Sequence, residues 1–383
     1  MTVLDVFLAV VGGLLLTVVL LSIIRTLLVP RGSPPGIYSF VDRVVSKAMR
    51  IVGRRLSGYR KRDGLYAYEG AAILVCVLGL WVVLLLAAFT LLLLPSVHRP
   101  FLALREAGAS MLTLGFVSTP SVWATFVDFL AGGVGLFVVA LQIAYLPTLY
   151  SAFNRRETEV TLLSARAGQP PWGPELLART TLSDLDGLMT SFYINWERWA
   201  ADVKESHASY PVLMRFRSPE PASSWIVGLL AVCDAAALMH SVSPTQTPME
   251  ARLALRMGYL CFRQLASNVG FEVDHDPKPD SDIQLSYDDF MFGYNRLKQV
   301  GYKLERTPEE AWPHFKGWRV NYESAAYQLA NAVDAVPAEW AGPRSSGDRP
   351  IRFFMLKNRT PSDPDALDPT PFSPAVREDM EDH

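Results

Sequence analysis

Two long stretches of the sequence contain no charged side chain, and they constrain the fold more than any other feature. They cover residues 70–97 and 129–154. Each exceeds the roughly 20 apolar residues that cross a bilayer as a helix. A third stretch, residues 6–24, is equally apolar and lies between Asp5 and Arg25. The sequence therefore predicts an all-α membrane protein with three transmembrane helices.

The remaining composition excludes several classes of protein. The net charge of −2 offers no general basic field for nucleic acid. The three cysteines lie in apolar surroundings without a CxxC motif, which is typical of buried hydrophobic residues. The six histidines are scattered, and no Ser/His/Asp set suggests catalysis. We therefore expect no enzyme activity, no cofactor and no nucleic-acid partner.

The distribution of basic residues predicts the topology. Residues 30–68 contain nine lysines and arginines but only two acids, Asp42 and Asp63. Short positive loops stay in the cytoplasm, so the N-terminus is predicted outside the cell membrane. The third span ends at Arg155 and Arg156, which places the large C-terminal region in the cytoplasm. Residues 1–30 thus form the N-terminal transmembrane helix.

Within the basic linker, residues 31–68, an amphipathic helix is predicted over residues 38–56. Its apolar residues recur at helical spacing, with arginine and lysine on the other side. Two interpretations are equally good. The helix lies along the inner leaflet and is held by anionic membrane lipids, or it packs on the protein's own spans.

The connection between the second and third spans, residues 99–120, is too short for a domain and too apolar for a plain loop. Residues 100–112 have the pattern of a short helix that begins at Pro100. An extended segment with a central glycine follows, from Thr113 to Pro120. This order is typical of a re-entrant pore helix and filter, which membrane proteins tolerate where protein or water surrounds the backbone.

Residues 70–153 resemble the pore domain of the potassium-channel superfamily, with Thr-Leu-Gly-Phe at 113–116 in place of the family's Thr-Val-Gly-Tyr. The resemblance implies a pore domain over residues 69–153 and a homotetramer with K⁺ or other monovalent cations on its axis. Thr113 would supply a hydroxyl and a carbonyl to the ions. Backbone carbonyls would come from Leu114, Gly115 and Phe116, and the filter would extend to Val117.

Two positions depart from the family pattern. Val117 replaces the second filter glycine and Ser118 the acidic residue that follows. A β-branched residue disfavours the backbone torsions of that glycine, so the outer filter should differ in shape. The segment also resembles the filters of cyclic-nucleotide-gated channels, Thr-Ile-Gly-Glu-Thr-Pro, which select poorly among cations. Ion selectivity stays open, and Gly115 can alternatively be a turn glycine in an external hairpin.

Three charges lie in or near this region. Arg105 and Glu106 fall on the short helix, where each needs a partner: the other, a neighbouring group or water. We expect a structural ion pair behind the filter in preference to a role in conduction. Asp128 falls in the outer half of the third span. It either faces a water-filled cavity or bonds a neighbouring helix or Arg105.

The third span also contains candidates for gating. Gly132, Gly133 and Gly135 permit either helix bending or the close approach of another helix. Pro147, near Gln142, is a second candidate hinge close to the cytoplasmic end.

Residues 154–337 are predicted to form a mainly helical cytoplasmic domain. Thr247 and Thr307 each match a capping box followed by proline. Residues 224–239 are almost entirely apolar but contain Asp234, and a buried core helix is preferred to a fourth span. Residues 338–383, rich in proline and aspartate, are predicted to be largely disordered.

A loop in this domain is crowded with acids. Its carboxylates form a weak candidate calcium site, and a solvated acidic loop is the alternative. The candidate ligands are Asp274, Asp276, Asp280 and Asp282.

Two functions follow from the sequence. The first is a tetrameric cation channel, which passes ions passively through a carbonyl-lined filter and is gated by the cytoplasmic domain. Potassium is the expected ion, with a poorly selective pore next. The second is a non-conducting membrane sensor or scaffold with a degenerate channel-like loop.

Overall fold

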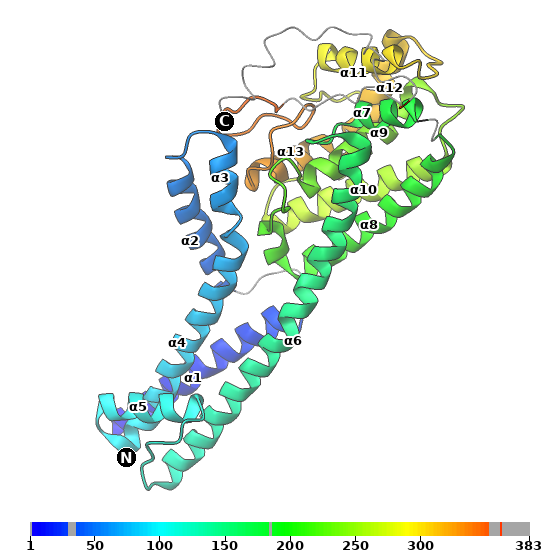
Figure 1. Ribbon diagram of the computed structural model, residues 1–383. Coiled ribbons are helices and arrows are strands. Elements are labelled where there is room, and N and C mark those ends of the chain that lie inside the picture. Colours follow the sequence, from blue (N-terminus) through cyan, green and yellow to red (C-terminus); the bar gives the residue numbers. More distant parts are fainter. Residues whose placement is uncertain (1, 30–35, 184–185, 352–360, 362–383) are drawn as a thin grey trace. The chain divides into compact units, whose positions relative to one another are not determined.

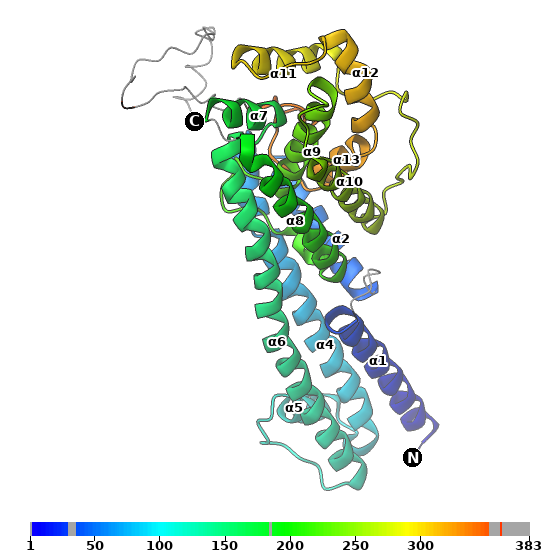
Figure 2. The same ribbon diagram turned by 90° about the vertical axis from the view of Figure 1, so that its right-hand side faces the viewer.

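The computed structural model describes residues 2–29, 36–183, 186–351 and 361, and within them every regular element is a helix. The chain forms two compact units. Unit 1 contains Met1–Arg155 and Glu205–Arg217, and unit 2 contains Arg156–Lys204 and Ser218–His383. Figures 1 and 2 show the helices from two sides, coloured from the N-terminus in blue to the C-terminus in red.

Unit 1 is built on long apolar helices. Its elements are α1 (Val3–Leu27), α2 (Gly36–Gly53), α3 (Tyr59–Tyr66), α4 (Glu69–Val97), α5 (Pro100–Met111), the first part of α6 (Val122–Ala167) and the short 3₁₀ helix η2 (Pro211–Arg215). Among the described residues, helices in four places are long and apolar enough to cross a membrane: α1, the α3–α4 stretch, α6 and α9 of unit 2. Such helices are compatible with a multi-pass membrane protein.

Helices α1 and α4 pack closely against each other (Figure 2). A Cβ atom at Gly12 would lie 2.9 Å from the backbone oxygen of Ala88, so glycine is what allows the two backbones to approach. Further along the pair, the indole N–H of Trp81 donates to the hydroxyl of Ser22 over 3.3 Å. This bond provides a partner for two polar groups that the apolar core would otherwise isolate.

Helix α2 packs on α3 and the start of α4. Gly53 lies against the ring of Tyr66, and the hydroxyl of Ser46 donates to the carboxylate of Glu69 over 2.6 Å. One face of α2 therefore packs on the protein's own helices, as the second interpretation of the linker expects. Its opposite face is exposed.

Unit 2 surrounds one apolar helix. Its elements are the end of α6, α7 (Gly173–Leu182), the 3₁₀ helix η1 (Asp186–Leu188), most of α8 (Met189–Ser209), α9 (Trp225–Val242), α10 (Met249–Val269), α11 (Tyr287–Gln299), α12 (Pro308–Arg319) and α13 (Glu323–Ala332). Helix α9 packs against α7, α10, α12 and α13, and all its residues except His240 are buried. Its apolar sequence is therefore covered by protein.

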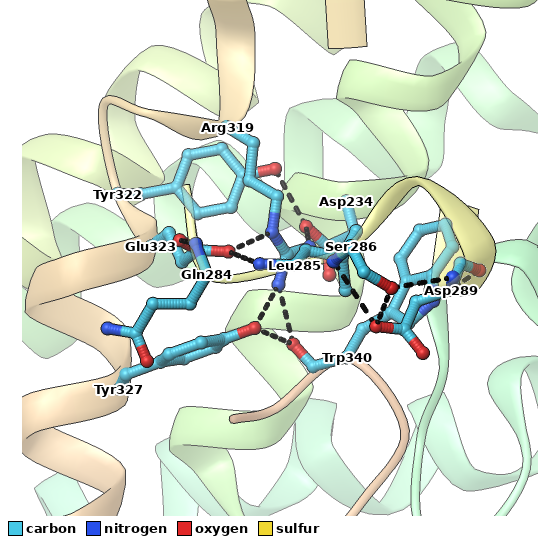
Figure 3. Close-up of polar contacts among 10 residues, drawn as sticks. All are labelled: Asp234, Gln284, Leu285, Ser286, Asp289, Arg319, Tyr322, Glu323, Tyr327 and Trp340. Carbon is cyan, nitrogen blue, oxygen red and sulfur yellow. Dashed lines mark hydrogen bonds and ion pairs between the residues drawn. The ribbon is translucent and has the colours of Figure 1, made fainter. Parts of the chain in front are cut away.

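A buried network holds the centre of unit 2 together (Figure 3). Arg319 donates to the carboxylates of Asp234 and Glu323 and to the backbone oxygen of Trp340. Tyr322 donates its hydroxyl to Asp234 over 2.7 Å. Burial alone would lower the pKa of Arg319, but Asp234 leads the neighbouring groups that raise it well above its usual value. The network gives Asp234 the partners that a carboxylate inside an apolar helix needs.

The start of the predicted tail belongs to this core. Ala338, Trp340 and Ala341 are buried. The ring of Trp340 lies 5.6 Å from that of Trp172 and 5.3 Å from that of Phe315, measured between centroids. Of the predicted tail, residues 352–360 and 362–383 lie outside the described part of the chain.

Candidate functional site

The candidate site is the connection from α5 to α6, at one end of unit 1 (Figures 1 and 2). Helix α5 begins at Pro100, whose missing N–H is no loss at the first helical position. It packs on α4 and ends at Met111, one residue before the predicted end. The loop that follows runs through residues 112–121 to the start of α6.

The first turn of the loop points two successive backbone N–H groups at the same acceptor. The N–H groups of Leu114 and Gly115 both donate to the backbone oxygen of Ala109, over 2.7 and 3.3 Å. The carbonyl of a planar trans peptide points opposite to its N–H. The carbonyl oxygens of Thr113 and Leu114 therefore both point away from the end of α5.

This arrangement requires unusual backbone torsions. Thr113 has φ of 56° and Gly115 has φ of 62°. Glycine adopts such values freely, whereas for a β-branched residue they are strained. Strain of this kind costs about 1–3 kcal/mol and persists where the surrounding structure imposes it. The two hydrogen bonds to Ala109 in α5 support this strained turn.

The side chains of this turn face outwards in the single chain. Leu114 and Phe116 are 60% and 59% exposed, and Val117 is half-buried. The hydroxyl of Thr113 donates to the backbone oxygen of Leu112 over 2.7 Å.

Glu106 fastens the far end of the loop. Its side chain is fully buried, and its carboxylate accepts two hydrogen bonds from Thr119: one from the N–H over 2.6 Å and one from the hydroxyl over 2.7 Å. The guanidinium of Arg105 lies 5.9 Å from the ring centroid of Phe116 instead. Arg105 and Glu106 therefore do not form an ion pair with each other, contrary to the prediction, and each contacts a different neighbouring residue.

Asp128 bonds the neighbouring helix. Its carboxylate accepts a hydrogen bond from the hydroxyl of Ser110 in α5 over 2.7 Å. Of the two environments predicted for Asp128, the structure therefore shows the bond to a neighbouring helix and not the water-filled cavity. The bond ties α6 to the last turn of α5, directly before the loop.

The glycines of α6 divide into two kinds. A Cβ atom at Gly135 would lie 2.1 Å from the backbone oxygen of Met111, and one at Gly132 would lie 3.3 Å from that of Ser110. Nothing lies within 4 Å of such an atom at Gly133. Gly132 and Gly135 therefore allow the end of α5 to approach α6.

Further along α6, the helix continues through Pro147. Pro147 is exposed and Gln142 is half-buried. Two residues before the proline, the ring of Tyr145 packs edge-on against Tyr210, 5.6 Å away. Proline removes a backbone hydrogen bond from the helix at this point.

Sequence reasoning missed a polar clamp in unit 1, formed by Asp42, Asp63, Glu69, Arg215 and Arg217. Arg215 donates to the carboxylate of Asp42 over 3.1 and 3.2 Å and lies 3.6 Å from Glu69. Arg217 donates to Asp63 over 2.6 Å. Burial alone would lower the pKa of Arg215, but Glu69 and Asp42 raise it above its usual value.

Phe216, between the two arginines, connects the clamp to α4 and α6. Its ring occupies the space that a Cβ at Gly70 would need, and it lies 6.0 Å from Tyr150 and 5.7 Å from Phe153 between centroids. Arg217 and Asp63 are 154 residues apart in sequence, and Arg215 and Asp42 are 173 residues apart. No local sequence pattern predicts pairs at such separations.

The candidate calcium ligands are not brought together. In the described part of the chain, no group of three or more acidic, histidine or cysteine side chains could hold a metal ion. Asp274 instead accepts the N–H of Asp276, and Asp282 pairs with Lys316 over 3.0 Å. The acidic loop is therefore not arranged as a cation site.

No family model, no curated protein and no solved structure matches this chain.

Proposed function

We propose that the chain is one subunit of a homotetrameric cation channel, with the filter formed by the carbonyls of residues 113–117. One observation carries the proposal. The N–H groups of Leu114 and Gly115 converge on the backbone oxygen of Ala109, so the carbonyls of Thr113 and Leu114 both point away from α5. Backbone carbonyls directed away from the supporting helix are available to replace a cation's hydration shell, as a filter requires.

The surroundings of the loop support this proposal. It lies between α4 and α6, two apolar helices, and it is fastened at one end to Ala109 and at the other to Glu106. Irregular backbone of this kind belongs in a membrane only where protein or water surrounds it. A single chain leaves the loop exposed, and a ring of four copies would enclose it.

The polar clamp is the proposed link from gating stimulus to pore. Residues 205–217 of unit 1 interrupt the sequence of unit 2. They hold α2, α3 and α4 through Arg215 and Arg217, and they contact α6 on both sides of Pro147 through Tyr210 and Phe216. A movement of this segment would act directly on α6. Pro147 is the proposed hinge, because the helix lacks a backbone hydrogen bond there.

A non-conducting sensor or scaffold is the second candidate. Val117 in the place of the second filter glycine favours it, since valine restricts the torsions available to the outer filter. The orientation with the N-terminus outside and unit 2 in the cytoplasm is proposed for both candidates, on the basic residues between α1 and α4.

Flux from liposomes distinguishes the two. Purified protein is reconstituted under K⁺ and Na⁺ gradients beside Gly115→Asp and a matched control, Gly301→Asp. Both glycines have positive φ and open space around the missing Cβ, but Gly301 lies in unit 2. The channel predicts flux that Gly115→Asp abolishes and Gly301→Asp retains, with K⁺ favoured. Equal flux in the two variants, or none in the wild type, contradicts it.

A further inference from the structure

The outer face of α2 combines two kinds of exposed side chain. Phe40, Val44, Ile51 and Val52 are 55%, 51%, 49% and 49% exposed. Basic residues share this face and its end: Arg43, Lys47, Arg54 and Arg55, all exposed. Positions 40, 44, 47 and 51 recur every three or four residues and so form one stripe of α2, and Arg54 and Arg55 directly follow its last residue. We call these eight residues the basic face.

The clamp pairs and largely covers the acids of the linker, so that few negative charges are exposed beside the basic face. Asp42 and Asp63 are the two acids in residues 36–68. Arg215 holds the first and Arg217 the second, with the carboxylates mostly covered. Arg215 also lies 3.6 Å from Glu69, so two arginines from a distant part of the chain face three carboxylates and offset most of their negative charge. The exposed charges of the basic face stay positive.

Chain connectivity keeps the basic face near the ends of apolar helices. Residues 28–35 connect α1 to α2, and residues 67–68 connect α3 to α4. Both α1 and α4 belong to the stretches long and apolar enough to cross a membrane. Exposed apolar residues interleaved with arginine and lysine fit the boundary between acyl chains and headgroups.

We propose that the basic face of α2 binds the surface of a bilayer that contains anionic phospholipid. The apolar side chains enter the acyl boundary, and the arginines bind lipid phosphates through paired hydrogen bonds. Each basic residue adds attraction to an anionic leaflet. The proposal depends on the membrane location of unit 1 and not on ion conduction, so a failed flux experiment leaves it standing.

The first test is a lipid titration. The detergent-solubilised full chain is titrated with dioctanoyl-phosphatidylglycerol, with the matching phosphatidylcholine and with glycerol 3-phosphate, and binding is followed by thermophoresis. One variant replaces four basic residues by glutamine: Arg43, Lys47, Arg54 and Arg55. A matched control replaces four exposed basic residues of unit 2 by glutamine: Arg198, Arg256, Lys298 and Lys303.

The proposal predicts that phosphatidylglycerol binds more tightly than phosphatidylcholine and that the first variant weakens this binding at least about tenfold. The control variant keeps the wild-type affinity, and glycerol 3-phosphate, without acyl chains, binds far more weakly. An equal loss of phosphatidylglycerol affinity in both variants overturns the proposal, because the anionic lipid would then be attracted by basic residues anywhere on the protein. Equal binding of the two lipids also overturns it.

A second measurement uses the wild-type chain and does not depend on the folding of a variant. Amide hydrogen exchange is compared in nanodiscs of phosphatidylcholine with and without one quarter phosphatidylglycerol. Residues 36–55 should become more protected when the anionic lipid is present. Exchange that is the same in the two nanodiscs overturns the proposal. This includes the case in which a second copy of the chain protects residues 36–55 equally in both.

Discussion

Replacement of Thr119 by valine tests whether Glu106 fastens the loop between α5 and α6. The substitution nearly preserves side-chain volume and removes one hydroxyl donor from a carboxylate that is fully buried. Hydrogen bonds to charged groups contribute about 1.5–3 kcal/mol, and a buried acceptor that loses its donor is not compensated by water. We expect Thr119→Val to lower the free energy of unfolding by about 1.5–3 kcal/mol.

The matched control is Thr125→Val in α6. Its hydroxyl is exposed and donates to the backbone oxygen of Ser121, the residue directly before α6. Removal of this hydroxyl should therefore change stability by less than about 0.5 kcal/mol. Both variants are unfolded by SDS in mixed micelles, followed by circular dichroism. Thr119→Ser, which keeps the hydroxyl, should recover most of the loss. Equal stability of the two valine variants would refute the role given to Glu106.

Three further predictions concern packing and buried charge, each measured by thermal or SDS unfolding of the full chain. Gly135→Ala should destabilise the protein by about 1–3 kcal/mol because its Cβ would overlap the backbone of α5. Gly133→Ala should be neutral or slightly stabilising. Similar effects of the two substitutions would contradict the close approach of α5 to α6 at Gly135. Asp63→Asn and Arg217→Met should show a coupling energy of about 0.5–3 kcal/mol in a double-mutant cycle, since the two side chains pair over 2.6 Å. Additive effects of the two substitutions on the free energy of unfolding would contradict the clamp. Arg319→Met should destabilise unit 2 by about 3–5 kcal/mol because it strands two buried carboxylates, and a loss below about 1 kcal/mol would contradict the network.

Features encoded by local pattern were accessible from the sequence. The apolar stretches predicted α1, α4 and the first part of α6, although α6 continues beyond the predicted end of the third span to Ala167. Pro100 together with apolar spacing predicted α5 to within one residue. The capping box at Thr307 is confirmed, with Thr307 and Glu310 bonding reciprocally. The one at Thr247 is wrong, because α10 starts at Met249 and the Thr247 hydroxyl donates back to Ser243.

Features that depend on tertiary contact were not accessible. Arg105 and Glu106 are adjacent on a helix, so their side chains point about 100° apart and do not face each other. Which partner each finds depends on how the loop folds back over α5. The clamp is a stronger example, because its arginines reach carboxylates more than 150 residues away in sequence. The sequence places residues 205–217 in the C-terminal domain, whereas they pack in unit 1.

The most direct test of the proposed function is electrical recording from purified protein in planar bilayers. A pore formed by residues 113–117 predicts discrete unitary current steps that reverse near the equilibrium potential of the permeant cation. Gly115→Asp should abolish the steps, and Gly301→Asp should retain them. Silent bilayers in which the reconstituted protein is demonstrably present, or steps that persist unchanged in Gly115→Asp, would contradict a pore at this loop.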